Sequence, residues 1–379
     1  MTVTLKGMTW SHPRGYDPMI ASSRIWKERT GVEVVWDKRS LQDFESYPVD
    51  ELARAYDLIV MDHPHVGQIT AEGCLCPLDL DGRTEERAAL AKASIGPSWS
   101  SYFWRGHQWA LPIDAATQVQ AFRPDVLSSA PTTLAAIMDL AQQGCVMVPL
   151  KNPHAIMTFF TLAANLGMPC AQDDDVLVDR ATGEHVYDLM RQLVALMPAD
   201  SFDMDPIDAS EAMARSDSRI AVIPYTYGYV SYAIEGFREK RLDFSPVPAA
   251  GAQGGAGGTL GGTGIAVSAR SAHAALAVDF AYWIAGEEAQ KGPYAAAGGQ
   301  PAHAVAWEDD QVNQPVADFY RKTRLALDTS YLRPRYDGYM RFQAQASDCL
   351  ARALAEGRNG RQAIGDLETL YRASRPLPS

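Results

Sequence analysis

The first 65 residues alternate short β-branched runs with helical segments, and this alternation limits the fold more than any other feature of the sequence. Apolar runs at residues 3–5, 32–36 and 56–61 are separated by segments whose apolar spacing predicts helices over residues 17–29 and 41–54. Strands that alternate with helices pair in parallel, because each helix carries the chain back to the same end of the sheet. The sequence therefore predicts an α/β fold with mainly parallel sheets flanked by helices.

Each of the three runs ends in a turn that is rich in hydrogen-bonding and titratable side chains. The carboxyl ends of parallel strands line the crevice in which open α/β sheets hold ligands. We therefore expect ligand contacts from Trp10, His12, Arg14, Asp37, Arg39, Asp62 and His63. Arginine pairs with carboxylates and phosphates through two parallel hydrogen bonds, so Arg14 and Arg39 together would favour an anionic ligand. The alternative interpretations are a solvated turn around Asp37 and a helix cap at Asp17.

The later part of the chain adds a smaller group of candidate ligand-binding residues. Tyr225 and Tyr227 follow an apolar run and could stack on the apolar face of a ring. Asp114 lies in a polar kink, and Thr263 lies in a glycine-rich stretch. That stretch lacks the Lys-Ser or Lys-Thr pair of a phosphate-binding loop. Its glycines instead indicate a chain crossing at which the backbone comes close to a ligand.

The turn at residues 62–65 also suggests a metal site, because imidazole and carboxylate are common metal ligands. Pro64 separates His63 from His65, so a single ion held by both histidines and Asp62 is not expected. The sequence contains no nucleophile elbow and no zinc-protease motif. We therefore predict no metal, no cofactor and no catalytic residue, with acid–base chemistry at Asp114 beside a histidine as the alternative.

The charge of the chain excludes one large class of partners. Its formal net charge is −12, from 46 acidic and 34 basic residues, whereas a nucleic-acid-binding surface needs concentrated Lys and Arg. The 379 residues suffice for two domains, and the five cysteines, which cannot all pair, are expected to be buried thiols. The run 155–169 is predicted to be a buried helix, too short to cross a bilayer. No apolar leader precedes the first strand, so either a signal peptide was removed or the protein is cytoplasmic.

Segments spread over most of the chain resemble, in their order, the extracellular solute-binding proteins of ABC transporters. The similarity is to the family 1-like members with the type II periplasmic-binding-protein fold, which often carry sugars. The matching segments lie near Asp57 and at residues 73–79, 111–117, 131–134, 258–270, 275–280, 287–290 and 299–301. Their ordered combination is specific for the fold.

The resemblance implies a clamshell of two α/β lobes that hold a solute between them and close by hinge motion. The implied N-terminal lobe comprises residues 1–113 and 260–308, and the C-terminal lobe comprises residues 115–257 and 309–379. Crossings are implied near residues 112–117, 255–262 and 301–312.

The resemblance also implies a function. A periplasmic monomer without catalytic activity would bind a small polar solute, either sugar-like or anionic, and deliver it to an ABC permease. A cytoplasmic enzyme or intracellular carrier on the same fold is the alternative. Ferric-ion binding is a minor alternative. The ferric-ion branch of the superfamily uses histidine, carboxylate and a pair of tyrosines, and Tyr225 and Tyr227 could supply the tyrosines here. Arg333 and Arg335 could reach the rim of the site, unless they lie on a surface helix.

Overall fold

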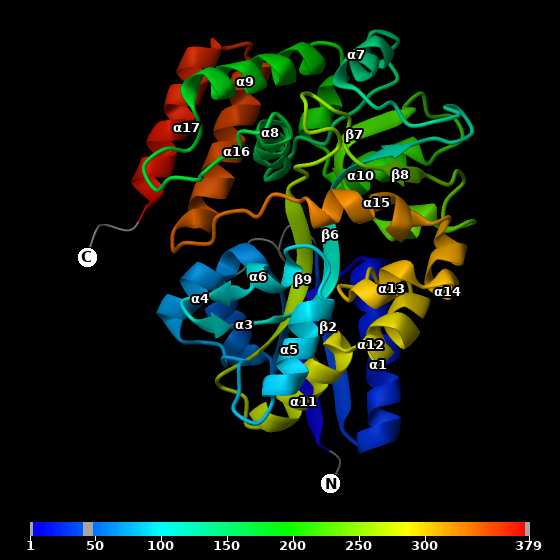
Figure 1. Ribbon diagram of the computed structural model, residues 1–379, viewed down its shortest axis with the longest axis vertical. Helices are drawn as coiled ribbons and strands as arrows, with labels where there is room; N and C mark the ends of the chain where they lie inside the picture. Colours follow the sequence, from blue (N-terminus) through cyan, green and yellow to red (C-terminus); the bar gives the residue numbers. More distant parts are fainter. Residues whose placement is uncertain (1–2, 41–47, 376–379) are drawn as a thin grey trace. The chain divides into compact units, whose positions relative to one another are not determined.

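The computed structural model describes residues 3–40 and 48–375, and the chain divides into two compact units (Figure 1). The chain passes from one unit to the other within strands β6 (Leu111–Phe122) and β9 (Leu260–Val267). Each unit is therefore built from segments that are distant in the sequence. Unit 1 comprises Met1–Ala116, Gly261–Pro315 and Arg335–Asp337, and unit 2 comprises Thr117–Leu260, Val316–Pro334 and Gly338–Ser379.

The sheet of unit 1 is parallel in its first three strands. Strands β2 (Glu33–Arg39), β1 (Thr4–Trp10) and β3 (Leu58–Asp62) lie side by side in that order and pair in parallel, which confirms the predicted alternation. Strand β9 then runs antiparallel to β3. Because of this direction, the first residues of β9 lie at the carboxyl end of β3.

Helix α1 (Pro13–Thr30) begins earlier than the predicted residue 17. His12 caps it, and Asp17 lies inside the helix, so the predicted capping role of Asp17 is wrong. Pro13 suits the first helical position, where its missing N–H has no intrahelical partner in any case. The helix ends at Gly31, whose φ of 75° is left-handed and favours glycine. The helix expected over residues 41–54 lies partly outside the described residues, and its described end belongs to α3.

The other elements of unit 1 contribute to its core together with the strands. Trp26 of α1 packs against Phe280 and Trp283 of α11, with ring centroids 5.7 and 5.3 Å away. Besides α1 and the sheet strands, unit 1 contains α3 (Val49–Ala55), η1 (His63–His65), α4 (Val66–Glu72), α5 (Thr84–Ala93), α6 (Ser98–Ser101), β4 (Phe103–Trp104), β5 (His107–Gln108), α11 (Ala274–Ala285), α12 (Glu287–Ala289), η4 (Gln290–Tyr294), α13 (Ala304–Glu308) and α14 (Asp310–Asn313), followed by η5 (Gln314–Val316).

Unit 2 has a different strand arrangement. Strand β6 pairs antiparallel with β7 (Val222–Tyr227) and β8 (Asp243–Ser245), and a parallel bridge joins Val146 to Val222. The expected buried helix is confirmed as α8 (His154–Asn165). The other helices are α7 (Leu134–Gln142), α9 (Arg180–Val194), η2 (Ala199–Phe202), α10 (Pro206–Met213), η3 (Val230–Ala233), α15 (Phe319–Asp328), α16 (Tyr339–Ala355) and α17 (Gly360–Ser374).

All five cysteines are free thiols, of which Cys74 and Cys170 are buried and the other three are partly exposed. Over residues 3–40 and 48–375, no helix has both the length and the apolar character needed to span a membrane.

Candidate functional site

The register of the unit 1 sheet places four of the predicted residues at one end of it. Trp10 of β1 lies opposite Arg39 of β2, and Asp62 of β3 lies opposite Thr263 of β9. Since β1 and β3 run in parallel, Trp10 and Asp62 both stand at the carboxyl end of the sheet. This end is where open α/β sheets hold their ligands.

Two other predicted residues bind each other. The Arg14 guanidinium donates from Nε to Oδ2 of Asp114 at 2.9 Å and from Nη2 to Oδ1 at 2.5 Å. Both side chains are buried, with 4% and 0% of their surfaces exposed. Burial raises the pKa of the Asp114 carboxyl, and the nearby guanidinium opposes that shift. Two of the arginine's donor groups are thus already occupied by a carboxylate of the chain itself.

His12 has a structural role at the start of α1. Its Nδ1 accepts a hydrogen bond from the backbone N–H of Arg14 at 3.1 Å, which assigns the neutral ring with its hydrogen on Nε2. The helix also packs closely on Trp10, because a Cβ at Gly15 would lie 2.2 Å from the indole. Glycine at this position lets the first turn of α1 cover the tryptophan.

In the turn after β3, the side chain of Asp62 makes its hydrogen bond within the turn itself. Asp62 Oδ1 accepts a hydrogen bond from the backbone N–H of His63 at 2.9 Å and lies 3.3 Å from Nδ1 of the same residue. The His63 ring is fully buried and packs edge-on against Tyr102, with centroids 6.2 Å apart. Among the described residues, no three His, Cys, Asp or Glu side chains are placed to hold a metal ion together.

The two candidates on β2 differ in exposure. Asp37 is exposed and accepts a hydrogen bond from the Tyr56 hydroxyl at 3.0 Å. Burial raises the pKa of Tyr56, and the Asp37 carboxylate adds to that shift. Arg39 is half-buried, and its carbonyl oxygen accepts from the backbone N–H of Ser11 at 2.7 Å. The Asp37 carboxylate therefore already accepts one hydrogen bond within unit 1.

Thr263 stands where β9 comes close to β6. Its hydroxyl is buried and has no hydrogen-bond partner in the described part of the chain. The neighbouring Gly262 has φ 87°, and a Cβ there would lie 2.3 Å from the carbonyl oxygen of Asp114. The glycine-rich segment therefore allows the backbones of β9 and β6 to approach each other closely.

Tyr225 and Tyr227 belong to unit 2 and lie within strand β7 itself, not beyond its end as the sequence suggested. The pairing of β7 with β6 is irregular between Ile223 and Thr226, next to Tyr225. Tyr225 is fully buried, its hydroxyl has no partner among the described residues, and burial raises the pKa of that hydroxyl. Tyr227 packs edge-on against His154 at the start of α8, with ring centroids 6.1 Å apart.

His154 was not predicted, and its surroundings are unusual for a histidine. It is 2% exposed, and Nδ1 has no hydrogen-bond partner in the described ranges. Burial lowers the pKa of His154 to about 3, and the positive charges of Arg333 and Lys151 lower it further. The ring is therefore neutral at physiological pH, with a polar nitrogen left without a partner inside unit 2.

Three more buried groups of unit 2, one of which is the Tyr225 hydroxyl described above, complete what we call the unit 2 polar cluster. Thr158 lies one turn after His154 on α8, and its hydroxyl has no partner within the described residues. Gln118 pairs with Tyr227 across β6 and β7, and its Nε2 is likewise without a described partner. Thr161, three residues after Thr158, donates to Gln118 Oε1 at 2.5 Å and so links the helix to the strand. The unit 2 polar cluster consists of Gln118, His154, Thr158 and Tyr225.

Neither arginine of the 333–335 segment lies on a helix, so the surface-helix interpretation is wrong. Arg333 is buried and donates from Nη1 to Gln343 Oε1 at 2.9 Å. Arg335 donates to the backbone carbonyls of Ser100, Ser101 and Phe103 at 2.5, 3.1 and 3.2 Å. Burial lowers the pKa of Arg335, yet these carbonyls hold its guanidinium at the end of α6.

The sequence contains a signal for His154 and Thr158, which the sequence analysis did not single out. Polar residues at positions 154, 158 and 161 recur every three or four residues in an otherwise apolar helix, so they share one helix face. A polar stripe on a fully buried helix needs partners, because buried polar groups without hydrogen bonds are costly. Gln118 carried no comparable signal, since its role depends on its register with β7.

The structure resembles solved solute-binding proteins over nearly its whole length. An ABC transporter solute-binding protein of Agrobacterium radiobacter K84, in complex with ribitol, has a TM-score of 0.80 and 19% identity and covers 98% of both chains. Maltose-bound MalE3 of T. maritima has a TM-score of 0.83 and 14% identity, covering 98% of this chain and 99% of its own. A Thermotoga lettingae TMO solute-binding protein bound with α-D-tagatose has a TM-score of 0.80 and 15% identity, with 98% and 99% covered. These likenesses confirm the predicted α/β type II fold.

The sequence comparisons agree with this fold. No curated protein matches the chain in sequence. A family model described as bacterial extracellular solute-binding protein matches residues 26–319. That match spans most of the 379 residues, and the chain therefore belongs to the family of bacterial extracellular solute-binding proteins.

Proposed function

We propose that this protein binds a neutral, polyhydroxylated small molecule and delivers it to an ABC permease from outside the cytoplasm. The observation that carries this proposal is the unit 2 polar cluster, four buried side chains that each have one polar atom without a partner among the described residues. A sugar or polyol hydroxyl both donates and accepts a hydrogen bond, so it suits an imidazole nitrogen, a hydroxyl or an amide equally well.

The chemistry of the cluster favours a neutral solute over an anionic one. The cluster itself carries no formal charge, because burial keeps His154 neutral and Gln118, Thr158 and Tyr225 are uncharged at physiological pH. In unit 1, Arg14 directs two of its donor groups to Asp114. The solved relatives point the same way, since they are bound to ribitol, maltose and tagatose.

We infer that unit 1 contributes polar contacts from Trp10, His12, Arg39, Asp62 and Thr263, with Asp37 and His63 further from the solute. Thr263 supports this assignment, because its buried hydroxyl has no described partner and it faces Asp62 across β3 and β9. Arg14 and Asp114 then hold the first turn of α1 against β6 instead of binding the solute directly. We propose a monomer and assign no catalytic residue.

Isothermal titration calorimetry with ribitol, tagatose, maltose and, as an anionic control, gluconate tests this function. We expect at least one neutral compound to bind, and His154→Gln to weaken it by about three- to tenfold, the value of one hydrogen bond. His185→Gln is the matched control, because His185 is an exposed histidine of the same unit. Binding of gluconate alone, or equal affinity of both variants, would overturn the proposal.

A further inference from the structure

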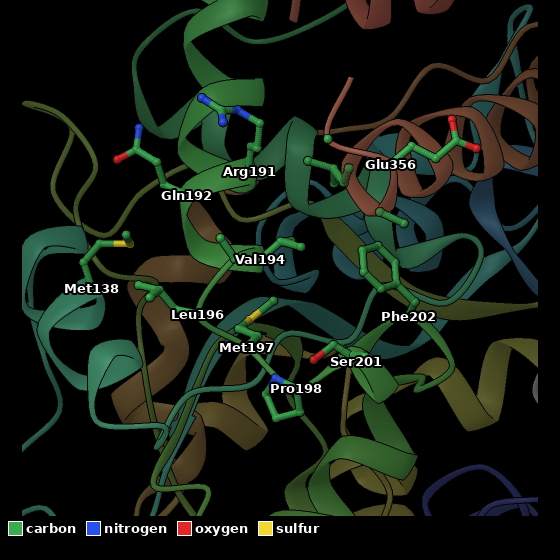
Figure 2. A pocket seen from close by; sticks show the side chains of 15 residues that line it. Met138, Arg191, Gln192, Val194, Leu196, Met197, Pro198, Ser201, Phe202 and Glu356 are labelled. Atoms are coloured by element: carbon green, nitrogen blue, oxygen red, sulfur yellow. The ribbon is translucent and has the colours of Figure 1, made fainter. Parts of the chain in front are cut away.

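A cavity in unit 2 lies apart from the polar cluster. Its volume is about 820 Å³, and it opens where the end of α9, the following turn, η2 and the end of α16 come together (Figure 2). None of the residues of the unit 2 polar cluster lines it. Pockets that hold small ligands have volumes of about 300–1,000 Å³, so this cavity is large enough for one.

The wall of this cavity is mostly apolar. Its main apolar side chains are Met138, Val194, Leu196, Met197, Phe202 and Leu354. Two of them are methionines, whose flexible thioether side chains adapt to ligands of different shape and contact aromatic rings favourably. Such a wall suits a hydrocarbon or aromatic body and offers little to a sugar.

One polar side chain in the wall lacks a partner. Ser201 at the cavity is 1% exposed, and its hydroxyl has no hydrogen-bond partner in the described part of the chain. Figure 2 shows Ser201 beside Met197 and Pro198, on the side of the wall formed by η2. A buried hydroxyl without a partner is costly, so a ligand that offers a hydroxyl or carbonyl oxygen there would gain a hydrogen bond.

The charged residues at the rim already have partners. Arg191 lies 3.4 Å from a carboxylate oxygen of Asp188, and Glu356 accepts from Arg358 at 2.6 Å. A charged ligand would therefore have to compete with an existing ion pair. Because the charges of Arg191 and Glu356 are already paired within the chain, the cavity favours an uncharged ligand.

From these observations we propose that this cavity is a second binding site, for an uncharged small molecule with an aromatic or aliphatic body and one hydroxyl or carbonyl group. Its hydrogen bond to Ser201 sets the orientation, and the methionine-containing wall holds the body. The site is independent of the proposed solute function, because the two sets of residues do not overlap.

The matched probes 2-phenylethanol and propylbenzene test this site, since they have similar size and differ by the hydroxyl group. Methionine-methyl NMR spectra of the whole protein report binding, with the Met138 and Met197 signals assigned through Met138→Leu and Met197→Leu. We expect 2-phenylethanol to shift both signals saturably and propylbenzene to bind about fivefold more weakly, as one hydrogen bond predicts. Ser201→Ala should remove that preference and keep the binding of propylbenzene.

A filled cavity provides the second arm of the test. Ala195→Trp introduces a large side chain at an exposed position of the wall and should abolish both shifts, whereas Ala135→Trp, exposed on α7 and outside the wall, should leave them unchanged. Shifts that persist in Ala195→Trp, no saturable shift in the original protein, or Ser201→Ala with an unchanged preference would each overturn the proposal. Met138 and Met197 signals that depend on protein concentration without any probe would do so too, because a second copy would then occupy the groove.

Discussion

The guanidinium of Arg14 binds the carboxylate of Asp114 through two hydrogen bonds, although the two residues are one hundred positions apart in the chain. The pair joins the first turn of α1 to strand β6 within unit 1. Both side chains are buried, so bulk water solvates neither charge. A residue that seemed suited to bind an anionic ligand is thus held by an anion of the chain itself.

Removing one partner of this pair should destabilise the protein strongly. Arg14→Ala leaves the Asp114 carboxylate buried and unpaired, and we expect it to lower the free energy of unfolding by about 3–5 kcal/mol. Urea unfolding followed by circular dichroism measures this change. Replacing both residues by Arg14→Met and Asp114→Leu should recover most of the loss, since no buried charge remains.

An exposed ion pair provides the comparison for Arg14. Arg180 binds Glu184 at 2.9 Å on the surface of α9, and Arg180→Ala should change the free energy of unfolding by less than about 1 kcal/mol. Equal effects of Arg14→Ala and Arg180→Ala would show that the buried pair is no more important than a surface pair.

The stability of the protein should depend on the protonation of His154. Its pKa is lowered to about 3 in the folded protein, against 6.5 in an ordinary histidine, because the ring is buried near Arg333 and Lys151. Between pH 6.5 and 3 the unfolded state therefore binds a proton that the folded state does not. The contribution of His154 is fully present above pH 6.5 and is lost as the pH falls, by up to about 1.4 kcal/mol per pH unit.

His154→Gln removes this titration. We expect the difference in the free energy of unfolding between His154→Gln and the unmodified protein to change by about 1–3 kcal/mol between pH 7 and pH 4, with the variant relatively more stable at pH 4. Urea unfolding at each pH unit measures it. A difference that is the same at every pH would contradict the buried, neutral state of the ring.

Gly262 should tolerate no side chain, because two separate constraints act on it. Its φ of 87° is left-handed, and a Cβ would lie 2.3 Å from the carbonyl oxygen of Asp114. We expect Gly262→Ala to lower the free energy of unfolding by more than about 2 kcal/mol, since the backbone of β6 has to move. Thermal and urea unfolding measure the loss.

Gly73 separates the two constraints. Its φ of 60° is also left-handed, but a Cβ there would meet nothing within 4 Å. Gly73→Ala should therefore cost only about 1 kcal/mol, the conformational part alone. If both variants lose the same stability, the close approach to Asp114 has no energetic consequence.

The hydroxyl of Tyr225 should matter for binding more than for folding. Because it is buried and has no partner among the described residues, Tyr225→Phe should change the free energy of unfolding of the solute-free protein by less than about 0.5 kcal/mol. The affinity for the neutral solute identified by calorimetry should fall by about three- to tenfold. Unfolding without solute and titration with it give the two values.

Tyr232 is the control for a tyrosine hydroxyl with a partner. It donates to Glu211 at 2.8 Å, so Tyr232→Phe should lower the free energy of unfolding by about 1 kcal/mol and leave the affinity unchanged. The assignment of Tyr225 to the solute site fails if Tyr225→Phe destabilises the protein without altering the affinity.

The sequence by itself determined the local parts of this fold. The β-branched runs became the parallel strands β1, β2 and β3, because alternation with helices leaves little other choice of pairing. The helix predicted to stop at residue 29 ends at Gly31, since a residue that tolerates positive φ suits that position. The placement of Trp10, Arg39 and Asp62 at the carboxyl end of the parallel strands follows from the same pattern.

The tertiary structure decided which polar groups have partners. Arg14 is held by Asp114 from a distant segment, and the antiparallel direction of β9 brings Thr263 next to Asp62. His154 meets Tyr227 only because α8 packs on β7. A local pattern shows that a side chain is polar and on which face it lies, whereas its hydrogen bonds depend on contacts between segments that are far apart in the chain.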